Sequence, residues 1–559
     1  GLTSARAASQ QEATDQLAAS EEAFSAAWAT LHGWWVRPAE LVPVVSQNLR
    51  ALKTGASSGR DLAAAGAQVA RATDLDGVRI RDGQIPLEPI RALESPLAAA
   101  QRDVSEAVVD LRGVRSPWLV GPVAVRLDDN LARLHDTERS LQTSSKLVDV
   151  LPDLLGAGGE RRWFLAVQTP TEARATGGFI GNFGEITASD GRLDLPRFGR
   201  IGELNAGGDR RSKKLLGPED YVARYQRFEV AATWQNVNLS PHFPSVAKVI
   251  AGLYPQSGGH PVQGVVSVDP AGIAAFLRLT GPLPVPSWPE PLTAENAERI
   301  LLYDQYVHFG ESSERVDFLG EAAQLLWRRL TTGDLPAPEA IVKVLGPAVE
   351  GKHLLVSSLD DDEDAALAGA GLNGALRSAQ GDALAVITQN ASGNKIDWFL
   401  ERSVDYRAEV NAETGDVKAR LRVSLRNQAP PAGLPGYLIG NALRPPLPAG
   451  TNRLYLSIYT PWNLTGASIG GAAAAMESES EAGRRVYSTF VDIPPLANVD
   501  VEVDLAGRMP NTRRYSLDLF AQPVVKPDVL RVSVAQTGKD PEVRSLVLRR
   551  DERLQFGRI

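Results

Sequence analysis

The 559-residue chain contains no cysteine and only two methionines, Met476 and Met509. The absence of cysteine excludes disulfide bridges and thiolate metal sites, and a shortage of oxidisable side chains suits an oxidising, extracytoplasmic setting. No run of about 18 apolar residues is present, so we expect no segment of this sequence to span a membrane. Because the first residue is Gly1 rather than methionine, we expect a signal peptide or a single anchor helix upstream of it.

The chain also lacks a basic excess and a histidine cluster. Its formal net charge of −8 argues against a general nucleic-acid binder, and we expect no nucleic-acid partner. The six histidines are scattered without a His-x-x-x-His pair, so a zinc hydrolase is not expected. Gly55–Gly59 fits G-x-S-x-G, but no strand precedes it and we expect a flexible linker. Gly369–Gly374 fits G-x-G-x-x-G but follows a helical pattern, and the acidic run Asp360–Asp364 is typical of a helix N-terminus.

The length predicts two to four domains, and 43% hydrophobic with 23% charged residues is typical of a folded protein. The residue pattern changes twice along the chain. We expect a helical membrane-proximal stalk at 1–158, a central α/β (α+β) domain at 159–396, and an antiparallel β-sandwich at 397–559.

Apolar residues recur at helical spacing in the first segment. One stripe contains Leu17, Phe24, Trp28, Leu31 and Trp35, and a second runs through 127–148. Such stripes are typical of helix–helix seams, and they carry no chemistry of their own.

The central segment mixes strand and helix signals. Strands are expected at 163–167, 183–188, 262–268, 353–357 and 383–388, with helices at 271–280, 293–309, 315–330 and 338–349. Asp190-Gly191 predicts a hairpin turn, and Asp269-Pro270 predicts a helix N-cap with proline in the first turn. The last strand is expected to close the central domain near residue 395.

The C-terminal segment shows strand and turn signals only. A hairpin is expected from 398–410 and 417–425, joined by a turn at 413–416. Further strands are expected at 453–459, 486–493, 499–505, 514–520 and 529–535, a spacing that favours a β-sandwich.

One segment has a pattern that suggests chemistry. Residues 168–184 read QTPTEARATGGFIGNFG, in which Glu172 and Arg174 are followed by Gly177 and Gly178. Glycine permits positive φ and close backbone approach, so amide N–H groups here could converge on an anion, with Arg174 making bidentate contacts. The alternative is a tight corner between two strands in which Glu172 and Arg174 pair with each other.

The charge of the following segment differs from that of the whole chain. From Arg192 to Arg227 there are nine basic and five acidic residues, in a chain that is acidic overall. Such a local excess suits an anionic ligand or a lipid headgroup surface, and it also fits an ordinary solvated loop.

The block Thr171–Gly181 resembles the signature of a bacterial envelope family known as domain of unknown function 4012 (DUF4012). The blocks Asn236–Pro244, Gly264–Pro270 and Asn394–Asp397 support the resemblance, which covers nearly the whole chain. It implies an N-terminal membrane anchor and an extracytoplasmic, cell-envelope location. The sequence departs from the family pattern at two acids, where His242 and Gln263 stand.

The order of elements is also distantly similar to that of LytR–CpsA–Psr enzymes, which transfer glycopolymers from a polyprenyl-pyrophosphate carrier to the cell wall. This resemblance implies that Glu172 and Arg174 form a first, catalytic site and that Pro196-Arg197 forms a second. Val265 to Gly281 would be the strand–helix unit. Phe198 stands where those enzymes have an acid after the second arginine.

Two functions follow from these resemblances. The first is a phosphotransferase in which Arg174, Arg197 and Arg200 hold a lipid-linked pyrophosphate, Mg²⁺ neutralises charge, and an apolar tunnel takes the tail. The second is a non-catalytic envelope protein that binds a lipid carrier, a glycan or a protein partner. The expected ligand-binding residues are Arg197, Arg200, Gly177, Gly178 and Asn236. A tunnel that opens beside Arg174 would favour the first.

Overall fold

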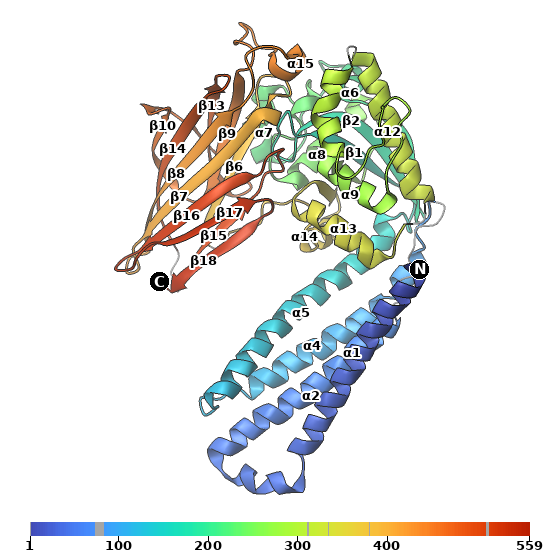
Figure 1. The fold of residues 1–559 in the computed structure, drawn as a ribbon, viewed down its shortest axis with the longest axis vertical. Coiled ribbons are helices and arrows are strands. Elements are labelled where there is room, and N and C mark those ends of the chain that lie inside the picture. The colour runs from blue at the N-terminus through green and yellow to red at the C-terminus, as the bar shows by residue number, and fades with distance from the viewer. Residues whose placement is uncertain are drawn as a thin grey trace. The chain divides into compact units, whose positions relative to one another are not determined.

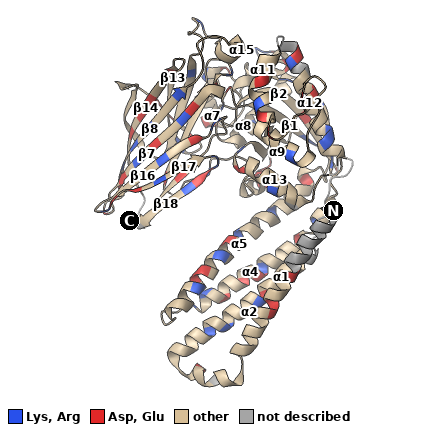
Figure 2. Ribbon diagram, viewed as in Figure 1, with Lys and Arg blue, Asp and Glu red and all other residues tan. Residues whose placement is uncertain are grey.

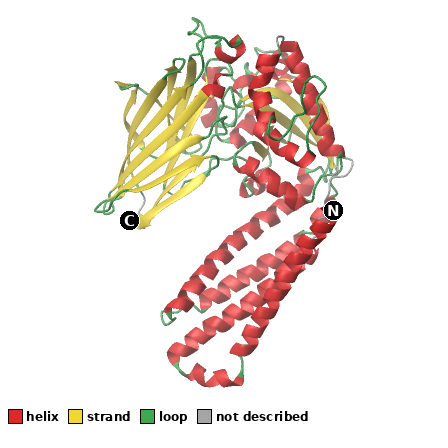
Figure 3. Cartoon of the chain, in the orientation of Figure 1, coloured by secondary structure: helices red, strands yellow, loops and turns green. Residues whose placement is uncertain are grey.

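The computed structural model of the chain describes residues 2–72, 83–309, 312–333, 335–379, 381–509 and 514–558 (Figure 1). Residues up to 80, 84–159 and 189–191 form one compact unit, and residues 81–83, 160–188 and 192–559 form a second. The first unit is helical, whereas the second contains every strand assigned in the described residues (Figure 3). Each unit is described separately below.

Long helices dominate the first unit, as its apolar periodicity predicts. They are α1 (Leu2–Leu31), the 3₁₀-helix η1 (Trp34–Leu41), α2 (Pro43–Ala72), α3 (Leu87–Arg91), α4 (Glu94–Gly113) and α5 (Gly121–Leu154). Helix α1 packs on α2, α4 packs on α5, and α2 also contacts α4. Among the described residues, no helix is long and apolar enough to cross a membrane.

Helix α2 runs without a break through Gly55–Gly59, so the expected flexible linker there is wrong. The glycines serve helix packing. A Cβ atom on Gly59 would lie 2.5 Å from the ring of Phe24 in α1, and a Cβ on Gly66 would lie 3.2 Å from Leu17. Small residues at these positions therefore let the two helices approach closely, which outweighs the low helix propensity of glycine.

The apolar stripes of the first unit are only partly buried. Leu127 and Leu131 of α5 pack with Leu111 of α4, as expected of a seam. Trp28 of α1 is 37% exposed and Trp35 is 59% exposed, so the first stripe also faces solvent. Charged side chains of both signs are spread along α4 and α5 (Figure 2).

The second unit contains a five-stranded sheet, called the central sheet below. Its strands are β1 (Arg161–Thr169), β2 (Phe179–Ser189), β3 (Arg192–Arg200), β4 (Gly264–Val268) and β5 (Leu354–Ser358), in the order β3-β2-β1-β4-β5. Strand β1 is antiparallel to β2 and parallel to β4, while β4 is antiparallel to β5. The expected turn joins β2 to β3, and Asp190 and Gly191 adopt φ of 47° and 81° there.

Helices cover both faces of this sheet. They are α6 (Ile201–Ala206), α7 (Glu219–Tyr225), α8 (Phe243–Leu253), α9 (Pro270–Thr280), α10 (Ala297–Arg299), α11 (Gln305–His308), α12 (Ser312–Thr332), α13 (Pro338–Glu350) and α14 (Asp361–Gly369). Short 3₁₀-helices lie at η2 (Gln226–Phe228), η3 (Trp234–Asn236), η4 (Pro255–Ser257) and η6 (Ile396–Phe399), and a π-helix lies at η5 (Ile300–Asp304). Helix α9 begins as predicted, because the Asp269 carboxylate accepts a hydrogen bond from the Gly272 N–H at 3.0 Å.

The alternation of side chains along β1 separates the two faces. Phe164 and Ala166 are fully buried and pack with α8 in one core cluster. Leu165 and Val167 lie on the opposite face, toward α9 and α12. The sheet is therefore buried on both sides, which agrees with the expected α/β character of this region.

Two mixed sheets form the C-terminal part. Their strands are β6 (Asp382–Asn390), β7 (Leu400–Val410), β8 (Asp416–Asn427), β9 (Asn452–Thr460), β10 (Asn463–Ile469), β11 (Ala472–Ala473), β12 (Glu477–Glu481), β13 (Arg484–Ile493), β14 (Asn498–Arg508), β15 (Arg514–Phe520), β16 (Asp528–Gln536), β17 (Glu542–Leu548) and β18 (Glu552–Arg558). Helix α15 (Gly436–Ile439) lies between β8 and β9. The sheet orders are β11-β10-β14-β8-β7-β16-β17 and β12-β13-β9-β6-β15-β18.

Two features of these sheets correct the expectations. The pairings of β6 with β15 and of β7 with β16 are parallel, so the sheets are not purely antiparallel. Strand β6 was expected to close the central region, but it pairs with β9 and β15 in the six-stranded sheet. Every residue of β6 is buried, and a continuously buried strand has no alternation that would reveal its sheet.

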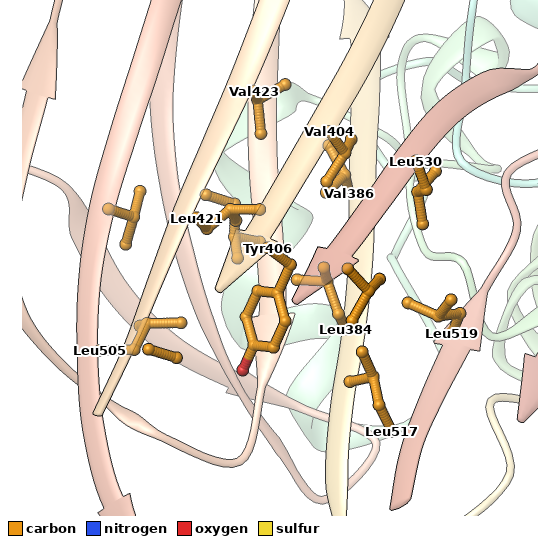
Figure 4. Packing of buried hydrophobic residues seen from close by; sticks show 14 of the residues in the cluster. Leu384, Val386, Val404, Tyr406, Leu421, Val423, Leu505, Leu517, Leu519 and Leu530 are labelled. Carbon is orange, nitrogen blue, oxygen red and sulfur yellow. The ribbon is translucent and has the colours of Figure 1, made fainter. Parts of the chain in front are cut away.

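The two sheets share one hydrophobic core (Figure 4). Leu384 and Val386 of β6 and Leu517 of β15 come from the six-stranded sheet, and Val404 and Leu421 come from the seven-stranded one. This core accounts for the period-2 patterns of the C-terminal sequence, since each strand turns one apolar face inward.

Candidate functional site

The loop between β1 and β2 brings Glu172 into a buried ion pair. Lys395 Nζ lies 2.6 Å from Glu172 Oε2, and Arg174 Nη2 lies 3.6 Å from Glu172 Oε1. Both basic side chains are almost fully buried, as is Glu172. The pairing of Glu172 with Arg174, stated above as the alternative to an anion site, is present, but the shorter contact is to Lys395.

Arg174 is occupied by protein oxygen atoms. Its Nη1 donates to the carbonyls of Ala173 and Asn390 at 2.9 and 3.0 Å, and its Nε donates to the Gln235 carbonyl at 3.1 Å. Its Nη2 donates to Asn236 Oδ1 at 3.3 Å. The guanidinium thus joins three segments of the chain, and its contacts are those of a structural arginine.

Asp397 is the second buried acid beside the two buried bases Arg174 and Lys395, so with Glu172 the four charges balance. Its Oδ2 accepts from the Ala173 N–H at 2.9 Å, and its Oδ1 accepts from the Asn452 side chain at 2.9 Å. Burial raises the pKa of the Asp397 carboxyl, and these hydrogen bonds oppose that shift. Burial lowers the pKa of Arg174. Burial also acts to lower the pKa of Lys395, but Glu172, Tyr437 and Tyr306 together raise it by more, so the net shift is upward.

Two glycines shape the loop, and their amides have partners within it. Gly177 has a φ of +136°, and a Cβ on Gly178 would lie 2.2 Å from the Thr169 carbonyl. The Gly178 N–H donates to Gln168 Oε1 at 2.9 Å, and the Gly177 N–H donates to the Arg174 carbonyl at 3.2 Å. Both amides therefore have partners within the loop, which is a close strand-to-strand corner.

The other sequence blocks that resemble the family meet this loop. Asn238 Nδ2 donates to the Gly178 carbonyl at 2.6 Å, and Gln168 Nε2 donates to Ser267 Oγ. Lys395 and Asp397 lie in the block 394–397. The sequence assigned these two residues no role, and the one signal for them was their place in a block that resembles the family. The four blocks thus form one buried polar cluster.

Arg197 and Arg200 take part in different contacts. The Arg197 guanidinium lies over the Phe183 ring with its carbon 4.9 Å from the centroid, and Nη1 donates to the Gly258 carbonyl at 3.2 Å. Arg200 is exposed at the end of β3. Asn236 is brought to Arg174 as expected, whereas Arg197 is held by another cluster.

The surroundings of Glu172 do not fit Mg²⁺. Its two oxygen atoms face the ammonium of Lys395 and the guanidinium of Arg174, so the cationic partners are already supplied by the protein. Within the described part of the chain, no group of three or more His, Asp or Glu side chains is placed to hold a metal ion.

An apolar cavity of about 170 Å³ lies on the face of the central sheet that carries Leu165 and Val167, toward α9 and α12. Leu165 and Val266 come from its strands, and Leu277, Ala323 and Leu326 come from α9 and α12. Asn182 is the one amide side chain among its lining residues. An engineered cavity of about 150 Å³ with a similar Leu/Ile/Phe lining stays dry and binds benzene, so this cavity can hold an apolar group.

A second cavity, of about 410 Å³, is lined by Arg174 and Asn236 together with Tyr455 and Phe490. None of its lining residues also lines the apolar cavity. The two cavities are therefore separate, and the apolar cavity does not open beside Arg174.

No curated protein matches the chain significantly. A solved structure from Legionella pneumophila, titled as a candidate nutrient binding protein, matches with 8% identity over 31% of this chain and 72% of that chain. Its TM-score is 0.18, and a likeness this low has no structural implication. Residues 158–306 match the model of a family described as "Protein of unknown function (DUF4012)". This match supports the resemblance of the central segment, from the start of β1 through η5, to that family.

Proposed function

We propose that this chain is a non-catalytic cell-envelope protein that binds the apolar tail of a lipid carrier in the cavity between the central sheet and helices α9 and α12. The apolar lining of that cavity carries the proposal. Transfer of an apolar group from water into such a lining is favourable, and a single amide leaves few polar groups to desolvate.

The volume of the apolar cavity limits the size of the ligand that it can enclose. At about 170 Å³ it is smaller than the pockets of about 300–1,000 Å³ that enclose drug-sized ligands. It therefore suits the end or one segment of a longer chain rather than a whole polyprenyl tail. An isoprenoid end is apolar throughout, as is nearly all of the lining of leucine, valine and phenylalanine side chains.

Binding is favoured over phosphotransfer by the contacts of Glu172 and Arg174. In a LytR–CpsA–Psr-like enzyme these side chains would have to reach a pyrophosphate. Here the Arg174 donors meet protein oxygens and the Glu172 carboxylate meets Lys395. Freeing Arg174 for a ligand would leave the buried Glu172 and Asp397 with less compensation.

The envelope location rests on composition. A chain of 559 residues without cysteine has no thiol to oxidise, which suits an oxidising compartment. Protease accessibility of the full-length protein in intact cells tests this location, and protection from added protease until lysis contradicts it.

Binding is tested by thermal unfolding with geranyl pyrophosphate, geraniol and inorganic pyrophosphate as separate probes. A ligand that binds only the folded state adds about 2.7 kcal/mol at a hundredfold excess over Kd. Geranyl pyrophosphate and geraniol should both raise the Tm, because the apolar part supplies the contacts, and pyrophosphate alone should not.

A cavity-filling variant locates the binding. Ala323→Phe in α12 places a ring in the cavity and should abolish the response to geraniol. Gln324→Phe adds the same ring at the next, exposed position of that helix and should keep the response. No response of the wild type, or equal responses of both variants, contradicts the proposal.

A further inference from the structure

The second cavity, of about 410 Å³, has no role in the proposed lipid binding. Its walls come from segments far apart in the chain: Phe228 and Asn236 follow α7, Gln389 is the last but one residue of β6, and Tyr455 and Phe490 lie in β9 and β13. All of these belong to the second compact unit. Its volume is in the range of pockets that bind small ligands.

Three neighbouring aromatic rings are part of the lining of this cavity. The ring centroids of Phe228 and Tyr455 are 5.5 Å apart, and those of Tyr455 and Phe490 are 4.9 Å apart. Phe490 is 39% exposed, although it lies on a strand of the C-terminal core sheet. Aromatic faces carry negative charge density and attract the polarised C–H groups of a flat apolar ring face, such as that of a pyranose.

Guanidinium groups border the rings. Arg453 lies over Phe490, with its guanidinium carbon 5.0 Å from the ring centroid, and lines the cavity beside Arg174. Its Nη1 is held by Asp492 at 2.9 Å, while its Nε and Nη2 have no hydrogen-bond partner among the described residues. The described side chains that line this cavity include no carboxylate. The two Arg453 donors without a partner therefore suit a ligand with negative charge.

An unpartnered buried amide oxygen indicates that the ligand carries a hydroxyl donor. Gln389 is 2% exposed and lines the cavity, and its Nε2 donates to the Leu239 carbonyl at 3.0 Å. Its Oε1 has no partner within the described residues. A buried acceptor without a donor costs free energy, and a ligand hydroxyl would remove that cost.

We propose that this cavity binds an anionic saccharide, with the pyranose face on Phe490, the acidic group on Arg453 and a hydroxyl on Gln389. Each of the three features alone fits many ligands. A ligand that satisfies all three has an apolar ring face, a negative charge and an O–H donor in one small molecule. A uronic acid and a sugar phosphate both have these groups.

Titration calorimetry with digalacturonate, glucose 1-phosphate and neutral maltose tests the proposal. We expect the two anionic sugars to bind in preference to maltose, and the affinity to fall with added salt, because a charged pair contributes. Either anionic sugar alone supports the site and assigns its acid as carboxylate or phosphate. Equal binding of maltose, or no binding of any probe by the wild type, overturns it.

Matched variants locate the binding. Phe490→Ala and Arg453→Gln should each weaken binding by about tenfold, roughly the effect of one good contact. Arg485→Gln removes the same charge from an exposed position of β13 outside the cavity and should change affinity by less than about twofold. Equal losses in Arg453→Gln and Arg485→Gln would show non-specific charge attraction and overturn the site. These saccharides and variants do not probe the apolar cavity. A negative result for saccharide binding therefore leaves the proposal of lipid binding, tested with geraniol, unaffected.

Discussion

Lys395 Nζ and Glu172 Oε2 lie 2.6 Å apart although 223 residues separate them in the chain, and both side chains are buried. The contact joins the β1–β2 loop of the central sheet to the segment that follows β6 in the C-terminal sheet. The two regions of the second unit are thus tied together by charge as well as by apolar contact, and the network has consequences for stability.

Breaking the pair on one side should be costly. Lys395→Met leaves the Glu172 carboxylate buried without its ammonium partner, and we expect a loss of about 3–5 kcal/mol in the free energy of unfolding. Urea unfolding followed by circular dichroism measures it. The double variant Lys395→Met/Glu172→Gln removes both charges and should recover part of the loss. A single variant within about 0.5 kcal/mol of the wild type would contradict a structural role for the pair.

The corner at Gly178 should tolerate no side chain. A Cβ there would lie 2.2 Å from the Thr169 carbonyl, so Gly178→Ala should shift the backbone and cost about 1–3 kcal/mol or more. Gly202→Ala is the matched control, because Gly202 lies in α6 with no atom within 4 Å of the new Cβ. It should be neutral or stabilise by up to about 1 kcal/mol. Thermal unfolding of the two variants distinguishes steric conflict from the general effect of losing a glycine.

Asp382 should make the stability of the C-terminal sheets depend on pH. Its carboxylate is buried between the hydroxyls of Tyr406 and Tyr515, and burial raises its pKa from 3.8 to about 6 despite these bonds. The folded state therefore binds this proton more tightly than the unfolded state. The stabilisation from protonated Asp382 is fully present below about pH 4 and is lost as the pH rises from about 4 to 6. Above that range Asp382 causes no further change in stability with pH.

The expected size of this contribution is about 3 kcal/mol, from two pKa units. Asp382→Asn has no such titration, so its stability relative to the wild type should rise between pH 4 and pH 6. Urea midpoints at several pH values measure this difference. Asp540→Asn changes an exposed aspartate and should leave the pH dependence as in the wild type. If the urea midpoints of Asp382→Asn and the wild type changed with pH in the same way, Asp382 would not be the group that causes this pH dependence.

The pKa of His353 should lie above the ordinary value for histidine. Burial lowers its pKa, but Asp269, whose Oδ2 lies 2.7 Å from Nδ1, together with Glu298 raises the pKa by more. The stabilisation is thus present at low pH and is lost as the pH rises through the folded pKa. In Asp269→Asn the burial remains and the charge is gone, so the His353 pKa should fall below 6.5. Imidazole proton shifts in NMR titrations report both values, and an unchanged pKa in the variant would refute the pairing.

Several elements were predictable because their signals are local. The α9 start at Asp269-Pro270 and the β2–β3 turn at Asp190-Gly191 lie where predicted. An N-cap and a tight turn depend on a few adjacent residues, so the sequence of those residues is sufficient. The helices of the first segment and the hairpin of β7 and β8 follow from periodicity for the same reason.

Other elements were not predictable because distant residues decide them. Gly55–Gly59 was expected to be a linker, but Phe24 packs against Gly59 in a continuous helix. Strand β6 follows the central region in sequence, yet its partners β9 and β15 come much later. In both cases a tertiary contact overrides the local preference.

The sequence by itself placed Glu172, Arg174 and Asn236 among the expected site residues, but it assigned no role to Lys395 and expected Arg197 at the same site. Only the tertiary structure decided what they do. Local sequence cannot show that Lys395 reaches Glu172, because that depends on how the β6 end packs on the central sheet. The physical reason is burial: an arginine and a glutamate exposed in a loop are available to a ligand, whereas the same pair enclosed with a lysine and an aspartate balances its own charge.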